Sequence, residues 1–314
     1  MNAENIFGGV LVPALTPFRA DLSPDIEAFL RHCRWLLDQG ADGLAIFGTT
    51  GEANSLSVEE RINLLDRLLE AGIPATKLMP GTGTCALTDT VRLTSHASKI
   101  GCGGVLMLPP FYYKGIQEDG LFAAFSEVIQ RVGDSRLRVY LYHIPPVSQV
   151  PISLDLVARL LKTYPDTVVG LKDSSGDWSN TLALLQSFPE FATFAGSEVF
   201  LLDTLRHGGV GCITATGNVN PGGIRSVYEQ WQSPQSDTLQ ARITEIRKTI
   251  QSYPMIPALK AIAGDFYDNP DWMTVRPPLS SLAETQRQAL FDEIGAIGFS
   301  MSGNKRSVGV AAYA

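Results

Sequence analysis

The chain has 314 residues, of which 45% are hydrophobic and 18% are charged, and its formal net charge at pH 7 is −7. This is the composition of an ordinary globular protein, and its length suits one large α/β domain or two average domains. The mild acidic excess gives no reason to expect nucleic-acid binding, which usually shows as a basic patch.

Cysteine usage and hydropathy bear on where the protein works. The four cysteines have no paired spacing, so we expect reduced thiols rather than a disulfide framework or a zinc site. The first residues lack the basic and apolar segments of a signal peptide, and no apolar run is long enough to span a membrane. We therefore expect a cytoplasmic protein with no membrane partner.

Short apolar runs alternate with helical patterns along the first half of the chain. Four runs bounded by turn residues predict buried strands: residues 8–15, 43–47, 77–80 (the weakest) and 104–108. Ser23 followed by Pro24 predicts the N-cap and first residue of a helix that Gly40 ends. Ser57 to Glu60 has the pattern of a capping box, which opens the next helix. Periodicity predicts two more helices, over residues 86–99 and through 121–129.

The same alternation continues in the second half. Four further runs predict strands: residues 138–142, 168–172, 192–195 and 211–214. Helices are predicted between them, one beginning at Ser153, one near residues 182–185 and one ending at Arg206, and Pro221 opens another. Beyond residue 233 the pattern is helical alone, around residues 239–250, 255–262 and 283–297.

Eight strand–helix pairs in a chain of this length predict a closed (β/α)8 TIM barrel with additional C-terminal helices. A doubly wound open sheet fits less well, because the first turn after a strand carries no glycine-rich dinucleotide fingerprint. We expect the barrel over residues 1–232, the helical extension over 233–300 and a loosely held tail over 301–314.

One predicted strand, residues 168–172, ends in a lysine and is followed at once by a Ser/Gly/Asp turn. Burying an ammonium group is costly unless it loses its proton or finds partners. A desolvated lysine gives up its proton more easily, and the free amine can attack a carbonyl to form a Schiff base. The alternative is that Lys172 snorkels to the surface or pairs with Asp173.

In a TIM barrel, catalytic groups lie at the carboxyl ends of strands and in the loops that follow them. This rule places an amine, several hydroxyls and turns rich in backbone N–H groups at one mouth. The set has no His, Asp or Glu cluster with metal-ligand spacing, which argues against a metal mechanism. The residues are Thr49, Thr50, Glu52, Tyr112, Tyr113, Tyr142, His143, Lys172, Ser197, Glu198, Thr214 and Asn218.

Three motifs stand in register along the chain: Gly48-Thr49-Thr50-Gly51-Glu52, then Tyr142 with Pro145 shortly after, then Gly170-Leu171-Lys172-Asp173. In this order and spacing they resemble the dihydrodipicolinate synthase/N-acetylneuraminate lyase family. Its members are class I, Schiff-base aldolases and dehydratases of 2-oxo acids. The resemblance covers nearly the whole chain, from Gly8 to the C-terminal helices.

The resemblance implies a set of catalytic roles. Lys172 would attack the ketone of pyruvate or a related 2-oxo acid, Tyr142 would shuttle protons, and Thr49 would relay them. Tyr112 matches a tyrosine that family members often insert into a neighbouring subunit's site, although an interface or loop aromatic is an open alternative. The family habit is a homotetramer built as a dimer of dimers, and no cofactor or metal is implied.

The resemblance also implies a substrate pocket. Thr50, in the turn that begins at Gly48, would bind the carboxylate of the 2-oxo acid, and backbone amides at such a turn suit an anion. Gly196 and Ile213 match positions whose backbone lines the pocket. Plain turn and packing roles are the alternative for the threonines.

The segment after Tyr142 departs from the family pattern. Dihydrodipicolinate synthases usually carry an arginine there that holds the carboxylate of the aldehyde substrate, and this chain has Val147, which offers no fork for a carboxylate. The usual asparagine after the tyrosine is His143, which either contacts a hydroxyl-bearing substrate or is satisfied by backbone at the strand end.

Three functions follow from these observations. The first is an aldolase or dehydratase acting on pyruvate, a 2-keto-3-deoxy sugar acid or a related 2-oxo acid. The second is a 4-hydroxy-tetrahydrodipicolinate synthase, which condenses pyruvate with aspartate semialdehyde and would need another cation, Arg276 or Lys114, in place of the arginine. The third is a non-catalytic 2-oxo acid sensor.

Overall fold

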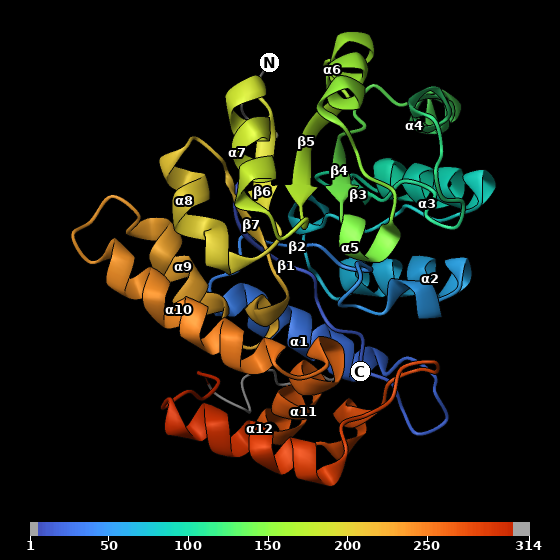
Figure 1. Cartoon of the computed structure of the whole chain (residues 1–314). Helices are drawn as coiled ribbons and strands as arrows, with labels where there is room; N and C mark the ends of the chain where they lie inside the picture. Colours follow the sequence, from blue (N-terminus) through green and yellow to red (C-terminus); the bar gives the residue numbers. More distant parts are fainter. Residues whose placement is uncertain (1–5, 304–314) are drawn as a thin grey trace.

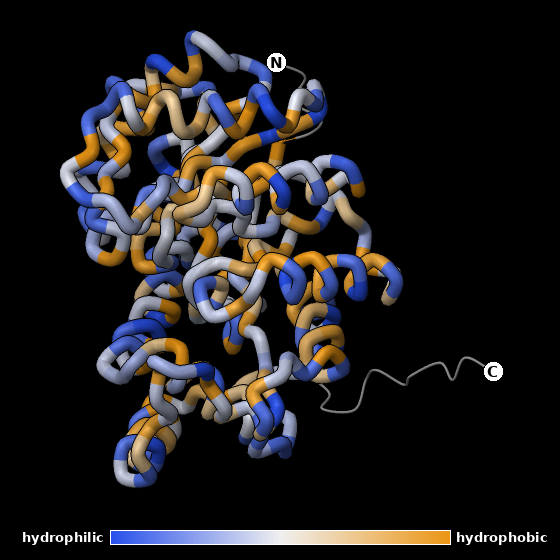
Figure 2. The backbone as a smooth tube through the Cα atoms, turned by 90° about the vertical axis from the view of Figure 1, so that its right-hand side faces the viewer, coloured by the Kyte–Doolittle hydropathy of each residue, from blue (hydrophilic) through white to orange (hydrophobic). Residues whose placement is uncertain are grey.

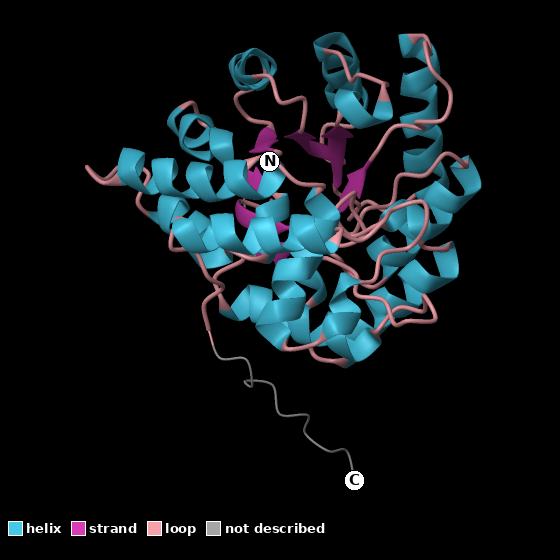
Figure 3. Ribbon diagram, turned by 60° about the horizontal axis from the view of Figure 1, so that its bottom comes forward, coloured by secondary structure: helices cyan, strands magenta, loops and turns pink. Residues whose placement is uncertain are grey.

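A computed structural model describes residues 6–303 of the chain. Its centre is one parallel sheet whose seven strands follow the order β2-β1-β7-β6-β5-β4-β3 and are surrounded by helices (Figure 3). The strands are β1 Gly9–Val12, β2 Gly43–Leu44, β3 Val105–Met107, β4 Val139–His143, β5 Val168–Asp173, β6 Ala192–Ala195 and β7 Gly211–Ile213.

The eighth position of the barrel lies between β2 and β3. Leu78 forms a parallel bridge with Leu44 of β2, and Gly81 forms one with Leu106 of β3. The N–H of Met79 donates to the carbonyl of Leu44 at 2.9 Å, and the N–H of Leu106 donates to the carbonyl of Pro80 at 3.0 Å. The predicted third strand is therefore present only as two bridges, because Pro80 has no N–H for a continuous ladder, and these contacts close the sheet into the predicted TIM barrel.

Helices cover the outside of the barrel (Figure 1). They are α1 Ile26–Asp38, α2 Val58–Glu70, α3 Leu87–Lys99, α4 Glu118–Val132, α5 Pro145–Ser148, α6 Leu154–Thr163, α7 Trp178–Ser187, α8 Leu201–Arg206 and α9 Pro221–Glu229. Along them, hydrophilic and hydrophobic residues alternate, as expected for helices with one buried face (Figure 2). The capping box predicted at Ser57 and Glu60 is present.

The start of α1 differs from the prediction by two residues. Asp25 is its N-cap, with the carboxylate accepting from the N–H of Ala28 at 3.1 Å. Pro24 instead forms an antiparallel bridge with Phe18. The Ser–Pro signal was misleading because the aspartate that follows is an equally good cap.

Apolar side chains fill the barrel interior and exclude water from its centre. They form one buried cluster: Leu11, Ala45, Met79, Leu106, Tyr140, Tyr142, Val169, Ala192, Phe194 and Ile213. Since side chains alternate along a strand, the residues between these face the helices. The interior is thus a packed core, and chemistry is confined to its ends.

Three helices follow the barrel as predicted: α10 Ser236–Gln251, α11 Met255–Tyr267 and α12 Glu284–Ala296. In Figure 1 the arrowheads of β4 and β5 point toward α10 and α11, so these helices lie at the carboxyl end of the barrel. Their core also contains Leu15, Ala28 and Val219 of the barrel, so the two parts share buried surface.

The predicted loose tail, residues 301–314, lies mainly outside the described residues. Within residues 6–303, Ser302 is attached to α1, because its carbonyl accepts from the indole N–H of Trp35 at 3.2 Å. In this same range no helix combines the length and the apolar character needed to cross a membrane.

Candidate active site

Lys172 and Tyr142 lie side by side on neighbouring strands. Lys172 is the second-last residue of β5, and its backbone is paired in register with that of Tyr142 on β4. Lys172 is 5% exposed and Tyr142 is 3% exposed. The lysine Nζ lies 4.3 Å from the centre of the tyrosine ring. Lys172 therefore does not snorkel to the surface, and its amine faces the mouth of the barrel.

Asp173, the next residue on β5, points to the other face of the strand. Its carboxylate accepts from the amide of Asn180 at 3.0 Å, the hydroxyl of Thr181 at 2.6 Å and the N–H of Ser175 at 2.9 Å. All three donors belong to the turn after β5 or to α7. Asp173 therefore fixes this turn and is not the counter-ion of Lys172.

The turn that follows β2 brings a hydroxyl to the phenol. Thr49 Oγ1 lies 3.2 Å from the hydroxyl oxygen of Tyr142, within hydrogen-bond distance, and either group can donate. Thr50 beside it is buried, with 8% of its surface exposed. Left-handed backbone at Phe47, with φ of 57°, and at Glu52, with φ of 54°, turns the chain sharply on both sides of the two threonines. The structure thus brings together Thr49, Tyr142 and Lys172.

Gly196 follows β6 directly, and Ile213 is the last residue of β7. The N–H of Gly196 donates to the carbonyl of Asp173 at 2.7 Å. A Cβ on Gly196 would lie 2.0 Å from the hydroxyl oxygen of Ser174 and 2.5 Å from that carbonyl, so only glycine fits. Ile213 ends β7 and is fully buried in the barrel interior.

His143 is held by backbone at the end of β4. Its Nδ1 accepts from the N–H of Ile152 at 3.0 Å, and the residue is 4% exposed. Burial lowers the pKa of His143, and the nearby charge of Asp173 opposes this only in part. The ring is therefore neutral at pH 7, and the contact to Ile152 matches the backbone-satisfied alternative given above.

Tyr112 and Val147 lie on the surface of the single chain. Tyr112 is 74% exposed and packs edge-on against Tyr113, with ring centres 5.4 Å apart. Val147, on α5, is 64% exposed. The nearby cation is Lys114, whose Nζ donates to the carbonyl of Ser148 at 2.6 Å, at the end of α5.

Comparison with known proteins bears on what this arrangement does. Residues 6–297 match the Dihydrodipicolinate synthetase family. An uncharacterized DapA-like lyase of Chloroflexus aurantiacus is 36% identical over 90% of this chain and 94% of its own length. The chain belongs to this family. It is accordingly a lyase.

Solved structures agree with this assignment. The crystal structure of dihydrodipicolinate synthase from Agrobacterium tumefaciens str. C58 has a TM-score of 0.86 and 32% identity, covering 93% of this chain and 99% of that one. YagE, a prophage protein of the dihydrodipicolinic acid synthase family from E. coli K12, in complex with pyruvate, has a TM-score of 0.84 and 25% identity, covering 93% and 99%.

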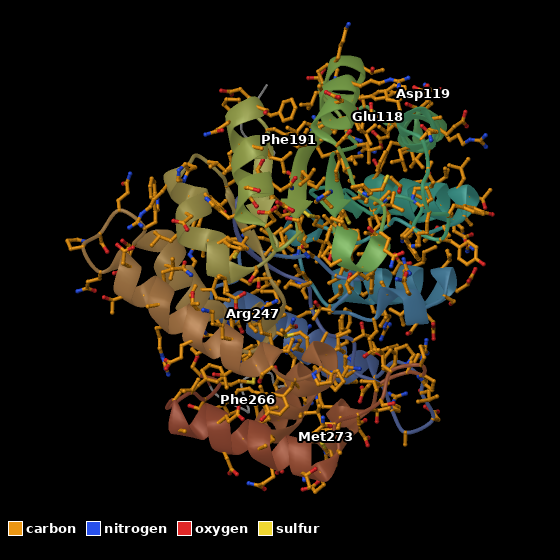
Figure 4. The ribbon with its side chains drawn as sticks, in the orientation of Figure 1. Glu118, Asp119, Phe191, Arg247, Phe266 and Met273 are labelled. Atoms are coloured by element: carbon orange, nitrogen blue, oxygen red, sulfur yellow. The ribbon has the colours of Figure 1, made fainter. Side chains whose placement is uncertain are left out.

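The lyase has a second polar cluster at the loops after β6 and β7. The buried carboxylate of Glu198 accepts from the hydroxyls of Thr214 and Thr216, and Arg247 Nη1 lies 3.3 Å from it. Arg247 comes from α10 and points toward these loops (Figure 4). The sequence placed Glu198 and Thr214 at the mouth but missed Thr216 and Arg247.

A further missed residue is Lys260 on α11, which forms a fully buried ion pair with Glu52. The sequence feature that could have indicated it is that Lys260 is the single charged residue in the apolar helical run over residues 257–263. A lone charge in such a run is expected to be buried and paired. Arg276, considered above as a replacement cation, is occupied instead by Glu60, with nitrogen–oxygen distances of 2.8 and 2.5 Å.

Among residues 6–303, no group of three or more His, Cys, Asp or Glu side chains is arranged to hold a metal ion. The groups at the mouth of this family member are an amine, a phenol, hydroxyls and backbone amides. Such groups can perform nucleophilic addition to a carbonyl and proton transfer.

Proposed function

We propose that the protein is a Schiff-base aldolase or dehydratase of 2-oxo acids in which Lys172 is the nucleophile. The observation that carries this proposal is the arrangement of three groups: the buried Lys172 amine, the Tyr142 ring 4.3 Å from it, and Thr49 Oγ1 at 3.2 Å from the phenol oxygen. A nucleophile, a proton carrier beside it and a hydroxyl that orients the carrier are the parts that covalent carbonyl chemistry needs.

The proposed reaction begins with addition of the Lys172 nitrogen to the ketone carbon of the substrate. Tyr142 donates a proton to the resulting hydroxyl, which leaves as water and gives a protonated imine. The imine accepts the electron pair released when a bond at C3 breaks. In the aldolase reaction the Tyr142 phenolate takes the proton of the C4 hydroxyl, and the C3–C4 bond breaks to release an aldehyde. In the dehydratase reaction the phenolate takes a C3 proton, and the C4 hydroxyl then receives a proton from Tyr142 and leaves as water. The enamine then takes up a proton or adds to an aldehyde, and water returns the free amine. Thr49 hands protons to and from Tyr142.

We assign the turn after β2 to the substrate carboxylate. Thr50 offers an N–H and a hydroxyl there, and Gly48 brings backbone close to the ligand. Gly196 and Ile213 line the other side of the pocket with backbone. In support, the crystal structure of YagE, whose fold matches over 93% of this chain, is that of a complex with pyruvate.

The leading substrate class is a 2-keto-3-deoxy sugar acid. Val147 supplies no cation for a second carboxylate, and His143, with its Nδ1 engaged by Ile152, leaves its other nitrogen for a hydroxyl-bearing substrate. A neutral polyhydroxy fragment therefore suits this side of the mouth better than aspartate semialdehyde.

A second candidate is 4-hydroxy-tetrahydrodipicolinate synthase. A Rhizobium meliloti enzyme of that name is 34% identical over 69% of this chain and 72% of its own length. The structural observation in its favour is Lys114, which is held beside α5 and puts a positive charge near Val147. On this candidate, Lys114→Met would abolish turnover of aspartate semialdehyde, whereas a sugar-acid lyase would keep its activity.

We also propose that the protein works in the cytoplasm as a homotetramer, a dimer of dimers. The exposed pair Tyr112 and Tyr113 is the feature that supports a contact between copies, since large aromatics are enriched at interfaces. Tyr112→Ser is expected to shift the mass measured by analytical ultracentrifugation, and an unchanged mass would exclude Tyr112 from the interface.

Imine trapping tests the proposed chemistry. The protein is incubated with pyruvate, reduced with borohydride and weighed by mass spectrometry, and the modified peptide is sequenced. We expect a single adduct on Lys172 and none on Lys172→Arg. If no 2-oxo acid gives an adduct, the catalytic proposal fails and the non-catalytic sensor replaces it. Assays of sugar acids and of aspartate semialdehyde then separate the two enzyme candidates.

A further inference from the structure

Glu52 ends the turn that carries Thr49 and Thr50, and its side chain is anchored outside the barrel. The carboxylate is buried and pairs with Lys260 of α11, and its Oε2 accepts from the N–H of Arg276 at 3.0 Å. Both partners belong to the C-terminal extension, more than two hundred residues along the chain. The turn after β2 is therefore held by a part of the protein that contributes no strand to the described barrel.

Lys260 is fully buried and is held from several sides. Its Nζ donates to the carbonyl of Thr274 at 2.8 Å and lies 4.4 Å from the centre of the Phe18 ring. Figure 4 labels Phe266 farther along α11 and Met273 just before Thr274, and it shows this part of the extension below the barrel mouth. Burial lowers the pKa of Lys260 to about 8, while the charge of Glu52 opposes the shift.

The residues after Glu52 are attached to neighbouring elements as well. Arg276 Nη1 donates to the carbonyl of Ser55 at 2.5 Å, and Arg61 of α2 donates to the carbonyl of Ala53. Before Glu52, the hydroxyl of Thr16 donates to the carbonyl of Gly51 at 2.8 Å. These contacts anchor the loop over residues 51–55 to neighbouring elements at four of its five residues.

A buried ion pair is a poor way to gain stability, because desolvation of both charges offsets most of their attraction. Such a pair instead fixes the positions of its two side chains, because a buried charge that moves away from its partner loses its compensation. Glu52 lies three residues after Thr49, whose 3.2 Å contact to Tyr142 is longer than a typical O–H···O hydrogen bond. A small displacement of this turn would break that contact.

We infer that Lys260 is a positioning residue for catalysis: through its ion pair with Glu52, the C-terminal extension sets the turn that presents Thr49 to Tyr142 and Thr50 to the substrate. This inference rests on the proposed Schiff-base function of the same site. Lys260 itself touches neither substrate nor reacting atoms. Through this ion pair, the C-terminal extension helps to hold the active-site turn in place.

The chain offers a matched control at the opposite end of the same strand. Asp42 comes directly before β2, pairs with Arg225 of α9 and accepts from the N–H of Val10 at 2.8 Å. This pair also connects the chain beside β2 to a helix, but it is partly exposed and lies at the end of β2 away from the mouth. The test therefore compares Glu52→Gln/Lys260→Met with Asp42→Asn/Arg225→Met, and includes each single variant.

Two rates are measured on each folded variant at 25 °C, together with its thermal midpoint. Borohydride trapping with pyruvate reports imine formation by Lys172, and exchange of the pyruvate methyl protons in D2O reports proton transfer. For Glu52→Gln/Lys260→Met we expect proton exchange to fall about 100-fold, the loss typical of a misplacement of about 1 Å. Imine trapping at saturating pyruvate persists, with half-maximal trapping at a higher pyruvate concentration. The Asp42/Arg225 control keeps both rates.

The outcomes separate the two proposals. If the unsubstituted protein gives no adduct, the proposed function fails before the inference is reached. If it gives an adduct and the Glu52/Lys260 variants match the Asp42/Arg225 control in both rates, differing only in thermal midpoint, the ion pair is merely structural and the inference is overturned. Should a single variant leave an unpaired buried charge and not fold, the double variant, which removes both charges, still gives the answer.

Discussion

Tyr142 and Lys172 are register partners on β4 and β5, and both side chains are almost completely buried at the same end of the barrel. Register pairing on adjacent parallel strands places the amine against the face of the phenol ring, 4.3 Å from its centre. The phenol oxygen is left free to contact Thr49. The register of β4 and β5 thus brings together the amine and the phenol that the proposed reaction needs, and no single sequence motif does so.

Replacing Tyr142 with Phe should separate nucleophilic attack from proton transfer. The ring stays beside Lys172, but the hydroxyl that moves protons is lost, so turnover should fall about 10²- to 10⁴-fold. Pyruvate trapping by borohydride should persist at a lower rate, and steady-state assays with the best substrate give the turnover.

Tyr140→Phe is the control for this variant. Tyr140 lies on the same strand and in the same interior cluster, but its hydroxyl accepts from the N–H of Phe7 at 2.8 Å, toward the amino end of the barrel. Its loss should cost about 1 kcal/mol of stability and leave turnover unchanged. Equal losses of turnover in both variants would contradict the role given to Tyr142.

Substituting Arg for Val147 should alter substrate preference. An arginine on α5 supplies the bidentate fork that a carboxylate needs, so activity toward aldehydes with a second carboxylate should rise about 10-fold, in line with one charged hydrogen bond. The ratio of kcat/KM for carboxylated and neutral aldehydes measures this. Val147→Gln, which adds a polar side chain without charge, is the control, and an unchanged ratio would show that α5 does not face the acceptor.

The stability of the protein should depend on His32, which is fully buried on α1. Its ring nitrogens lie 3.0 Å from the hydroxyl of Tyr267 and 3.0 Å from the side-chain oxygen of Asn218. Burial lowers the pKa of His32 to about 4. Between pH 6.5 and 4 the unfolded chain therefore binds a proton that the folded chain does not, and the free energy of unfolding should decrease by about 3 kcal/mol as the pH falls through this range.

Urea denaturation at pH 7 and at pH 4.5 checks this prediction. His32→Gln should be less stable than the unsubstituted protein at pH 7, because it loses buried hydrogen bonds, but it should lose less stability on acidification. If both proteins lose the same free energy between the two pH values, His32 does not titrate as described.

The fold was predictable because burial leaves a simple pattern. Parallel strands enclosed by helices are apolar throughout, so each appears as a short hydrophobic run, and the lysine that ends residues 168–172 stands out against such a run. The third run was the least certain, and its strand consists of two bridges in the structure. The proposed site followed from topology, because the carboxyl ends of all barrel strands meet at one mouth.

The supports of the site were not predictable in the same way. Lys260 and Arg247 act on turns far away in sequence, and no local pattern specifies such contacts. The sequence placed Glu52 in the turn after the strand over residues 43–47, but it indicated no partner for the carboxylate. Tyr112, which is proposed to lie between copies, is 74% exposed in the single chain, and the sequence around it does not specify its partner.

Gly196→Ala tests how closely the backbone around Lys172 is specified. The added Cβ would lie 2.0 Å from the Ser174 hydroxyl and 2.5 Å from the carbonyl of Asp173, the residue directly after the lysine. The hydroxyl can rotate away, but the carbonyl cannot, so β5 and β6 must separate at their carboxyl ends. We expect a loss of about 1–3 kcal/mol of stability from overpacking and a fall in imine trapping of about 10-fold or more as the amine is displaced.

The matched variant is Gly295→Ala on α12, where an added Cβ has no neighbour within 4 Å. Alanine favours the helix there by about 0.5–1 kcal/mol, so stability should rise while imine trapping stays constant. Thermal unfolding and borohydride trapping on both variants give the comparison. Full trapping activity in Gly196→Ala would mean that the β5–β6 contact tolerates a side chain and that the position of Lys172 does not depend on it.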